Sequence, residues 1–146
     1  MKKFSFNMEK VLKLRKHHEN ETKMELGRAV GILSAIEGNI QAIAEERVRV
    51  AANQFLPGNN ARDILQYSLY ITRLDNTKEK LQSDAAAAEL KVEEARGIYI
   101  EASRERKILD KLKEKQESEY RREFYSEETK LLDDIAAGTR TRNISI

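Results

Sequence analysis

The residues capable of metal or acid–base chemistry are few, and their spacing does not suit it. The chain has two histidines, His17 and His18, and no cysteine. Adjacent residues point to different faces of a helix, so these imidazoles cannot form the i, i+4 zinc pair of an HExxH helix. The acidic pairs Glu45–Glu46 and Glu93–Glu94 are typical of solvated helix faces. We therefore expect no catalytic, cofactor-binding or metal-binding residues, and no enzymatic activity.

Composition favours long exposed helices over a compact globular domain. Charged residues make up 36% of the chain and aromatic residues 6%, and there is one proline. Such a profile is typical of coiled coils, in which two helices bury one stripe each and build no central core. The N-terminal residues contain no apolar run of signal-peptide length, and no segment approaches membrane-spanning length. We therefore expect a cytoplasmic protein.

The dominant pattern is a heptad repeat of apolar residues between Ile64 and Leu109. Over this stretch only Lys78 and Arg106 bring a charged side chain to an a or d position. A seam that stays in phase for so long requires a facing helix and a left-handed supercoil. The seam positions are Ile64, Tyr67, Ile71, Leu74, Lys78, Leu81, Ala85, Ala88, Val92, Ala95, Tyr99, Ala102, Arg106 and Leu109.

The facing helix comes from the first part of the same chain, where a second heptad can be threaded. Its middle, from Leu26 to Ile43, is apolar. Polar side chains weaken the seam nearer the N-terminus, at Arg15, Glu19 and Thr22. Gly27, Gly31 and Gly38 each cost a helix up to about 1 kcal/mol relative to alanine, which suggests close approach or local bending at these positions.

One strong break divides the chain. Pro57 disfavours the helical conformation at Leu56, and Gly58 tolerates a positive φ. Asn60 is a good N-cap for a helix that restarts at Ala61. We therefore predict one all-α domain over residues 1–146, a long antiparallel two-helix coiled-coil hairpin with a C-terminal helical overhang. Its expected segments are a first helix at about residues 6–55, a turn at 56–60, a second helix at about 61–137, and a disordered tail at 138–146. The first helix is expected to start near Ser5 or Asn7, and Asn7 is a good N-cap residue type.

The register of this hairpin predicts where the two helices stop facing each other. With the turn centred near residue 58, residue 8 faces roughly residue 108, where the apolar seam ends. Residues 110 to about 137 then have no partner in the chain. Leu112, Tyr120 and Phe124 share one face of this overhang, which is typical of a docking surface.

Two further features predict contacts with partner proteins. Tyr70 lies off the seam near the turn, where an exposed aromatic side chain indicates a protein contact. Residues 1–24 carry seven Lys/Arg against three acids, and residues 104–125 carry eight against six. Because both stretches belong to the same end of the hairpin, that end should be positive and should orient a partner through charge pairing.

Three short stretches resemble the flagellar export protein family FliJ. An aromatic pair, Phe4 and Phe6, precedes a Val-Leu-x-Leu-Arg run at residues 11–15, as at the start of that family. The Tyr-x-x-Tyr-Ile-x-x-Leu stretch at residues 67–74 is similar to the segment that follows the family's turn. Residues 103–107 resemble its basic Arg-Glu-x-Lys segment. The resemblance covers helix order, turn position and overhang.

This resemblance implies a stalk similar to the central stalk of rotary ATPases. Its open end would enter the hexameric ring of the flagellar export ATPase, and its turn-proximal part would contact the cytoplasmic domain of the export-gate membrane protein. It also implies an export-chaperone role with substrate chaperones as partners, and recruitment to the membrane-associated export apparatus through partners alone. The residues expected at the gate are Tyr70, Leu74, Thr77 and Leu81. The residues expected at the ATPase ring are Arg15, Arg104, Arg106, Leu112, Tyr120, Arg121, Arg122 and Phe124.

Other readings of the sequence remain open. The basic end and the Arg140-x-Arg142 tail would suit a nucleic-acid-binding helical arm. Against that reading, acids interleave with the basic residues, and no aromatic stacking platform accompanies them. A prefoldin-like holdase would need strand-forming segments, which are not visible in the sequence. A structural coiled coil that dimerises through the overhang is the remaining alternative. We expect neither a nucleic acid nor a small-molecule ligand as partner.

Overall fold

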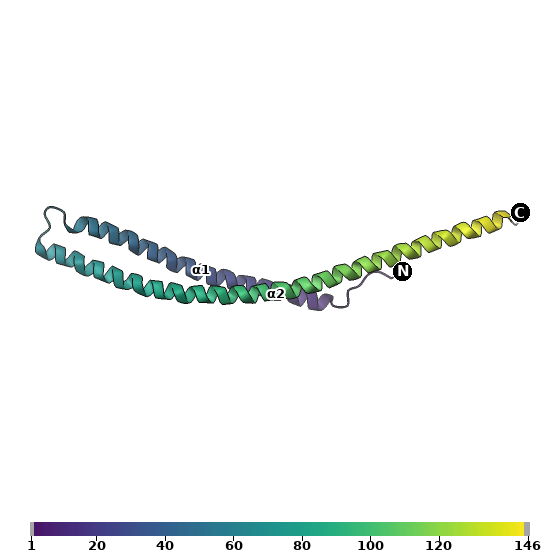
Figure 1. Cartoon of the computed structure of the whole chain (residues 1–146), viewed down its shortest axis with the longest axis horizontal. Coiled ribbons are helices and arrows are strands. Elements are labelled where there is room, and N and C mark those ends of the chain that lie inside the picture. The colour runs from purple at the N-terminus through teal and green to yellow at the C-terminus, as the bar shows by residue number, and fades with distance from the viewer. Residues whose placement is uncertain (1, 145–146) are drawn as a thin grey trace. The chain divides into compact units, whose positions relative to one another are not determined.

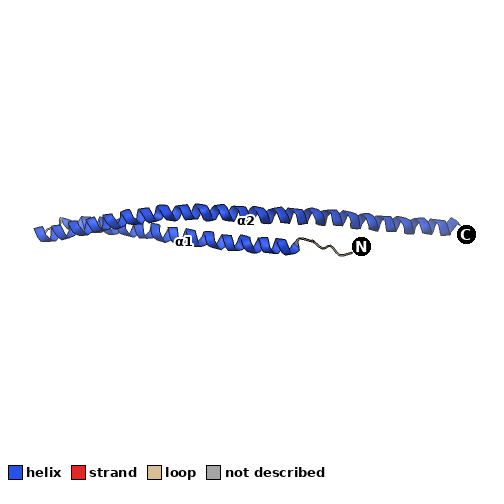
Figure 2. Ribbon diagram, turned by 90° about the horizontal axis from the view of Figure 1, so that it is seen from below, coloured by secondary structure: helices blue, strands red, loops and turns tan. Residues whose placement is uncertain are grey.

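The computed structural model describes residues 2–144, which form two helices joined by a short turn (Figure 1). Helix α1 spans Glu9–Gln54 and helix α2 spans Ala61–Ile144. The described residues outside these helices are the N-terminal segment 2–8 and the turn 55–60, as Figure 2 shows. The predicted all-α helical hairpin is therefore confirmed.

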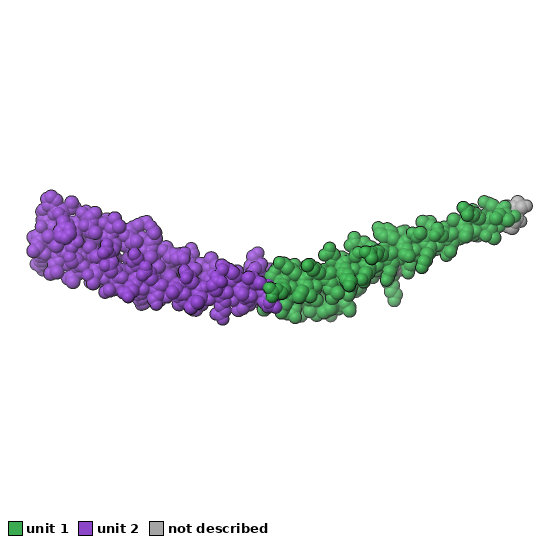
Figure 3. Space-filling model, viewed as in Figure 1, with its two compact units in different colours: residues 1–19, 102–146 green, residues 20–101 purple. Residues whose placement is uncertain are grey.

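The chain divides into two compact units, which Figure 3 colours separately. Unit 2 is Asn20–Glu101, which contains the turn and most of α1. Unit 1 combines Met1–Glu19 with Ala102–Ile146, so it brings the beginning of the chain against the second half of α2. Each unit pairs a segment of α1 with a segment of α2.

Unit 2 is held together by the predicted heptad seam. Every α2 seam position in this unit is buried or half-buried, with Leu74, Ala85, Ala88 and Val92 the most enclosed. On α1 the seam includes Val50, which is 2% exposed. The a/d pattern therefore identified the contact face of both helices, because a period of 3.5 residues keeps the same side chains on the partner.

One charged residue on the α1 seam of unit 2 forms an ion pair with a residue of α2. Arg47 continues the α1 heptad four residues after Ile43 and remains exposed. Its Nε donates to Asp75 Oδ1 of α2 at 2.7 Å. The guanidinium of Arg47 thus lies at the edge of the seam and not between the helices. The hydrogen bond to the Asp75 carboxylate raises the pKa of the Arg47 guanidinium.

The turn satisfies the helix ends that it connects. Asn59 Nδ2 donates to the carbonyls of Asn53 and Gln54 at 2.9 and 3.0 Å, so it caps the last turn of α1. Asn60 Oδ1 accepts from the Asp63 amide at 2.9 Å, and the Asp63 carboxylate accepts from the Asn60 amide at 3.2 Å. This reciprocal pair confirms Asn60 as the predicted N-cap and forms a capping box.

The three glycines in the middle of α1 have a different surrounding from the one that the sequence suggested. A Cβ built at Gly27, Gly31 or Gly38 would meet no heavy atom within 4 Å. All three residues are exposed. These glycines therefore do not allow a close approach between α1 and another part of the described chain. The outer face of α1 is open to solvent at these positions.

Both ends of the hairpin differ from the predicted bounds. Helix α1 begins at Glu9 and not at residue 6, because Phe6 is drawn into the unit 1 core and its carbonyl accepts from the Glu9 amide at 3.2 Å. Helix α2 continues through Gly138 to Ile144. Gly138 does not adopt the positive φ of a helix stop, because Gly58 is the residue with positive φ in the described chain. Residues 145–146 of the expected tail lie outside the described residues.

We predict opposite effects on stability from alanine at two glycines. Gly58 has φ +97°, a conformation that side chains rarely adopt, so Gly58→Ala should lower the free energy of unfolding by about 1–2 kcal/mol. Gly31→Ala should raise it by about 0.5–1 kcal/mol, because the added methyl group meets open space within a helix. Urea unfolding followed by circular dichroism measures both values. A stabilised Gly58→Ala variant would contradict the turn geometry.

Candidate functional site

The core of unit 1 is a small cluster at the place where the chain begins. Phe6, Leu12 and Leu109 are buried together, and Leu12 is 1% exposed. Phe4, Met8 and Leu112 pack around them. Leu112, one of the residues expected at the ATPase ring, is therefore half-buried against this cluster. It helps to build the surface and is not an isolated contact on an open helix.

The N-terminal segment covers the first part of the predicted overhang. Tyr120 Oη donates to the Lys2 carbonyl at 2.5 Å, and the Tyr120 ring lies 5.5 Å from the Phe4 ring. Lys113 Nζ pairs with Glu9 at 2.9 Å. Residues 110–120 therefore have partners in the chain, and the prediction that the overhang starts at residue 110 is wrong. Residues 121–144, all exposed, form the uncovered part of α2.

The register explains this difference. Residue 8 was expected to face roughly residue 108, but its neighbour Glu9 pairs with Lys113. Arg47 pairs with Asp75 near the turn and Glu9 pairs with Lys113 at the other end, and the residue numbers of each pair average to 61. The pairing is therefore centred near residue 61 along the whole hairpin, and not near residue 58. The segment 2–8 is called the strap below.

The arginines on the unit 1 seam are engaged in ion pairs. Arg106 Nε donates to Glu19 at 2.6 Å, and its Nη1 donates to Asp110 at 2.6 Å. The Glu19 carboxylate, followed by that of Asp110, raises the pKa of the Arg106 guanidinium. Arg15 lies 2.5 Å from Glu105 across the helices. Arg15 and Arg106, which the sequence analysis assigned to the ATPase ring, therefore form ion pairs that link α1 to α2 within the chain.

The other residues expected at the ring are accessible. Arg121 and Arg122 are exposed, and Phe124 is 39% exposed. Arg104 is exposed and also interacts within the chain. The Phe124 ring stacks on Tyr120, with a centroid distance of 6.4 Å and an interplanar angle of 25°. Accessible aromatic and cationic groups thus gather just beyond the strap.

The residues expected at the gate occupy two different positions in unit 2. Leu74 is buried and Leu81 is half-buried, as their place in the heptad implies. Tyr70 and Thr77 are exposed, and the Thr77 hydroxyl donates to the Arg73 carbonyl at 2.9 Å. The surface side of this set is therefore Tyr70 and Thr77, with the leucines beneath.

Tyr70 is part of a polar network that spans the helices near the turn. Its hydroxyl donates to Glu46 Oε1 at 3.2 Å, and Arg49 Nη2 donates to the same oxygen at 2.6 Å. The hydrogen bond from Arg49, together with that from Tyr70, lowers the pKa of Glu46. This network holds the Tyr70 ring at the edge of a hollow of about 510 Å³ beside Tyr67 and Asp63.

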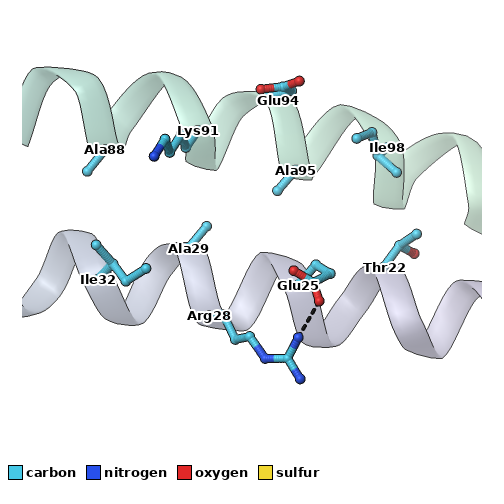
Figure 4. Close-up of a pocket in the computed structure, with 10 residues that line it drawn as sticks. All are labelled: Thr22, Glu25, Arg28, Ala29, Ile32, Ala88, Lys91, Glu94, Ala95 and Ile98. Carbon is cyan, nitrogen blue, oxygen red and sulfur yellow. Dashed lines mark hydrogen bonds and ion pairs between the residues drawn. The ribbon is translucent and has the colours of Figure 1, made fainter.

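Sequence reasoning missed a groove between the helices of unit 2, drawn in Figure 4. Its volume is about 430 Å³. The α1 and α2 seam positions here are small, with Ala29 facing Ala88 and Ala95, so the side chains do not fill the space between the backbones. Ile32 and Ile98 form its apolar walls, and both are more than half exposed. Alanine at the seam positions 29, 88 and 95 was the sequence signal for this groove.

Another missed feature is the apolar turn. Phe55 is 74% exposed and Leu56 is 50% exposed. From residue 50 to residue 61 the chain has no charged side chain.

Within the described residues, neither helix has an apolar stretch long enough to cross a bilayer.

The fold and these interactions define a class of protein. Two helices pair along a coiled-coil seam, and ionisable side chains form ion pairs along and across the helices. Tyrosine, phenylalanine and arginine side chains are presented on the outside, which is typical of a helical protein that binds other proteins.

The comparisons with known proteins identify the family. The model of the family described as flagellar FliJ protein matches residues 4–143. The chain therefore belongs to the FliJ family, as its sequence resemblance indicated, and is a component of the flagellar type III export apparatus. Neither a curated protein nor a solved structure matches the chain.

We predict that the Arg106 ion pairs stabilise unit 1. The Arg106 and Glu19 side chains are 25% and 17% exposed, so Arg106→Ala removes two charge-assisted hydrogen bonds from a poorly solvated carboxylate. This change should cost about 1 kcal/mol and increase amide hydrogen exchange in residues 9–19. Arg28→Ala is the control, because the pair of Arg28 with Glu25 is exposed within one helix. Equal exchange in the two variants would contradict this role.

We predict that the Glu9–Lys113 pair makes unit 1 sensitive to acid. The Lys113 hydrogen bond lowers the pKa of the Glu9 carboxyl group. Its contribution is therefore present above the pKa of the unfolded chain, and it is lost as the pH falls through the lowered folded value. In thermal melts at neutral and acidic pH, Glu9→Gln should reduce the acid-induced loss of stability. Lys113→Met should do the same, and the double variant should add nothing further.

Proposed function

We propose that this FliJ-family chain acts as a stalk in the export apparatus. Unit 1 would bind the ring of the hexameric flagellar export ATPase, and unit 2 would contact the cytoplasmic domain of the export-gate membrane protein. The observation that carries the proposal is the uncovered α2 segment 121–144. It is helical and exposed throughout, and an exposed stripe of this kind is typical of a segment that completes its packing on another protein.

Charge supports the assignment of the ring contact to unit 1. This unit carries 17 lysines and arginines against 12 acids, whereas unit 2 carries 10 against 13. An excess positive charge attracts and orients an acidic partner with modest net affinity, which suits a stalk that must bind without locking. Arg104, Arg121 and Arg122 would make direct contacts, while Arg15 and Arg106 would position α1.

Aromatic and apolar groups add a second contribution on unit 1. Tyr120 and Phe124 stack at the start of the uncovered segment, and Leu112 supports them from the core cluster. Desolvated aromatic side chains commonly supply a large share of the binding free energy at protein interfaces. We therefore assign Tyr120 and Phe124 the apolar part of the ring contact.

The proposed gate contact uses the surface of unit 2 near the turn. Tyr70 and Thr77 would touch the gate protein, and the buried Leu74 and half-buried Leu81 would fix their backbone position. The hydrogen bond from Tyr70 to Glu46 orients the ring before binding, which reduces the entropy lost in the complex.

The remaining parts of the proposal follow from the family resemblance. They are an export-chaperone role that includes contacts with substrate chaperones, and a cytoplasmic location with recruitment to the membrane through partners alone.

The charge order of the uncovered segment opposes a parallel dimer formed through it. Arg121 and Arg122 precede Glu127 and Glu128, Asp133 and Asp134 follow, and Arg140 and Arg142 come last. Two copies aligned in parallel register over this segment therefore place like charges opposite each other, which is unfavourable. An antiparallel alignment over residues 121–144 brings Glu123 opposite Arg142. Charge therefore argues against a parallel dimer and not against an antiparallel one.

We predict that the full chain stimulates ATP hydrolysis and hexamer formation by its cognate flagellar export ATPase. A truncation after Tyr120 keeps the strap contacts and the unit 1 core but removes the uncovered segment, so it should lose most of the stimulation. A truncation after Asp110 should lose all of it, because it also removes the partners of the strap. Steady-state ATPase assays and light scattering measure both effects. Failure of the folded full chain to stimulate the enzyme would refute the stalk role.

A further inference from the structure

The strap lies along α2 in a nearly extended form. Phe6 packs against Leu109, and the carbonyl of Lys2 accepts the hydrogen bond from Tyr120. Between Leu109 and Tyr120 the helix rises by about 16 Å. Four extended residues span about 14 Å, so the strap from Phe6 back to Lys2 must be close to its full reach. The strap and α2 therefore run in opposite directions, side by side.

The strap adds an aromatic ring to a row that begins inside unit 1 and ends in solvent. Phe4 meets Tyr120 at 5.5 Å, Tyr120 meets Phe124 at 6.4 Å, and Phe124 meets Tyr125 at 6.0 Å. These four rings are four of the nine phenylalanines and tyrosines of the chain. Tyr125, at the outer end, is 63% exposed. The row therefore contains residues from both ends of the sequence.

A hollow of about 390 Å³ opens where the strap meets the helix. Its lining is Phe4, Glu117, Tyr120 and Arg121. The surrounding surface is basic, because residues 2–4 and 111–122 together carry seven lysines and arginines against three acids. Lys2, Lys3, Arg121 and Arg122 are exposed. Two aromatic walls with a cationic rim accept an apolar side chain that is flanked by carboxylates.

We propose that the strap and α2 form one composite docking surface for an acidic segment of a partner protein. The segment inserts an apolar side chain beside Phe4 and Tyr120, and its carboxylates pair with Lys2, Lys3 and Arg121. This inference rests on the proposed ring contact and deepens it, because it adds the strap to the contact and gives the chemistry of the partner. The strap is then a binding element in its own right.

Charge argues for this occupant over two others. A second copy of the chain would bring the same basic surface against this one, which costs binding free energy. A nucleic acid would bring phosphates close to Glu114, Glu117 and Glu119, which lie between the basic residues of α2. An acidic segment can place its apolar side chain beside Glu117 and its carboxylates at Lys2, Lys3 and Arg121, so it uses both the aromatic walls and the basic rim.

The test uses the full chain with two probes, the cognate export ATPase and a synthetic 12-residue Asp/Glu-rich peptide that contains one leucine. Phe4→Ala should weaken binding of each probe by about tenfold, the loss typical of a central aromatic contact. Lys3→Glu, at an exposed position that needs no packing, should weaken binding and flatten its salt dependence. Leu90→Ala and Lys91→Glu in unit 2 are matched controls and should bind as the unmodified chain does.

Hydrogen exchange of the complex with the ATPase distinguishes the possible failures. Protection of residues 2–6 and 117–125 on binding supports the composite surface. If the ATPase binds with these residues unprotected and both strap variants bind normally, the surface is overturned while the ring contact stands. If the ATPase does not bind, the ring contact is refuted, and peptide binding alone tests the composite surface. Peptide binding that Phe4→Ala and Lys3→Glu weaken keeps the surface, and lack of peptide binding overturns it. Displacement of the peptide by a single-stranded oligonucleotide at physiological salt also overturns it.

Discussion

The structure depends on a narrow apolar seam, because most of the described surface of both helices is exposed. In unit 2 the seam is almost entirely apolar, and its alanine positions leave a groove instead of a filled core. In unit 1 the seam alternates between a three-residue buried cluster and ion pairs of Arg15, Arg106 and Lys113. The two units thus use different balances of hydrophobic and electrostatic stabilisation, and unit 1, which carries the proposed ring contact, has the more polar one.

The seam and the turn could be predicted because each depends on local rules. A period of 3.5 residues fixed which α2 side chains are buried, including the polar positions Lys78 and Arg106, which are half-buried. The turn followed from the intrinsic conformations of Pro57 and Gly58 and from the capping capacity of Asn60. These signals lie within a few residues of the structure they specify, so composition and spacing are sufficient to read them.

The parts of the site that were mispredicted depend on contacts between distant residues. No local pattern shows that the residues before α1 extend along α2 as far as Tyr120, since the two segments are 118 residues apart in the contact with Lys2. The same holds for Arg15 and Arg106, whose ion-pair partners are identified only when the register is known. Gly138 looked like a helix stop, but the Thr139 and Thr141 hydroxyls bond back to carbonyls in the helix that continues past it.

The strap has a further consequence for the order in which the molecule assembles. Near the turn, Gln54 bonds to Ser68, only 14 residues away, whereas Tyr120 bonds to the strap across 118 residues. The entropy lost on closing a loop grows with its length, so the contacts beside the turn form at the lowest cost and the hairpin closes from there outward. The strap, with the longest loop to close, docks last. During synthesis its binding site on α2 is also made long after the strap itself, so the strap has no docking site until the chain has been made as far as Tyr120.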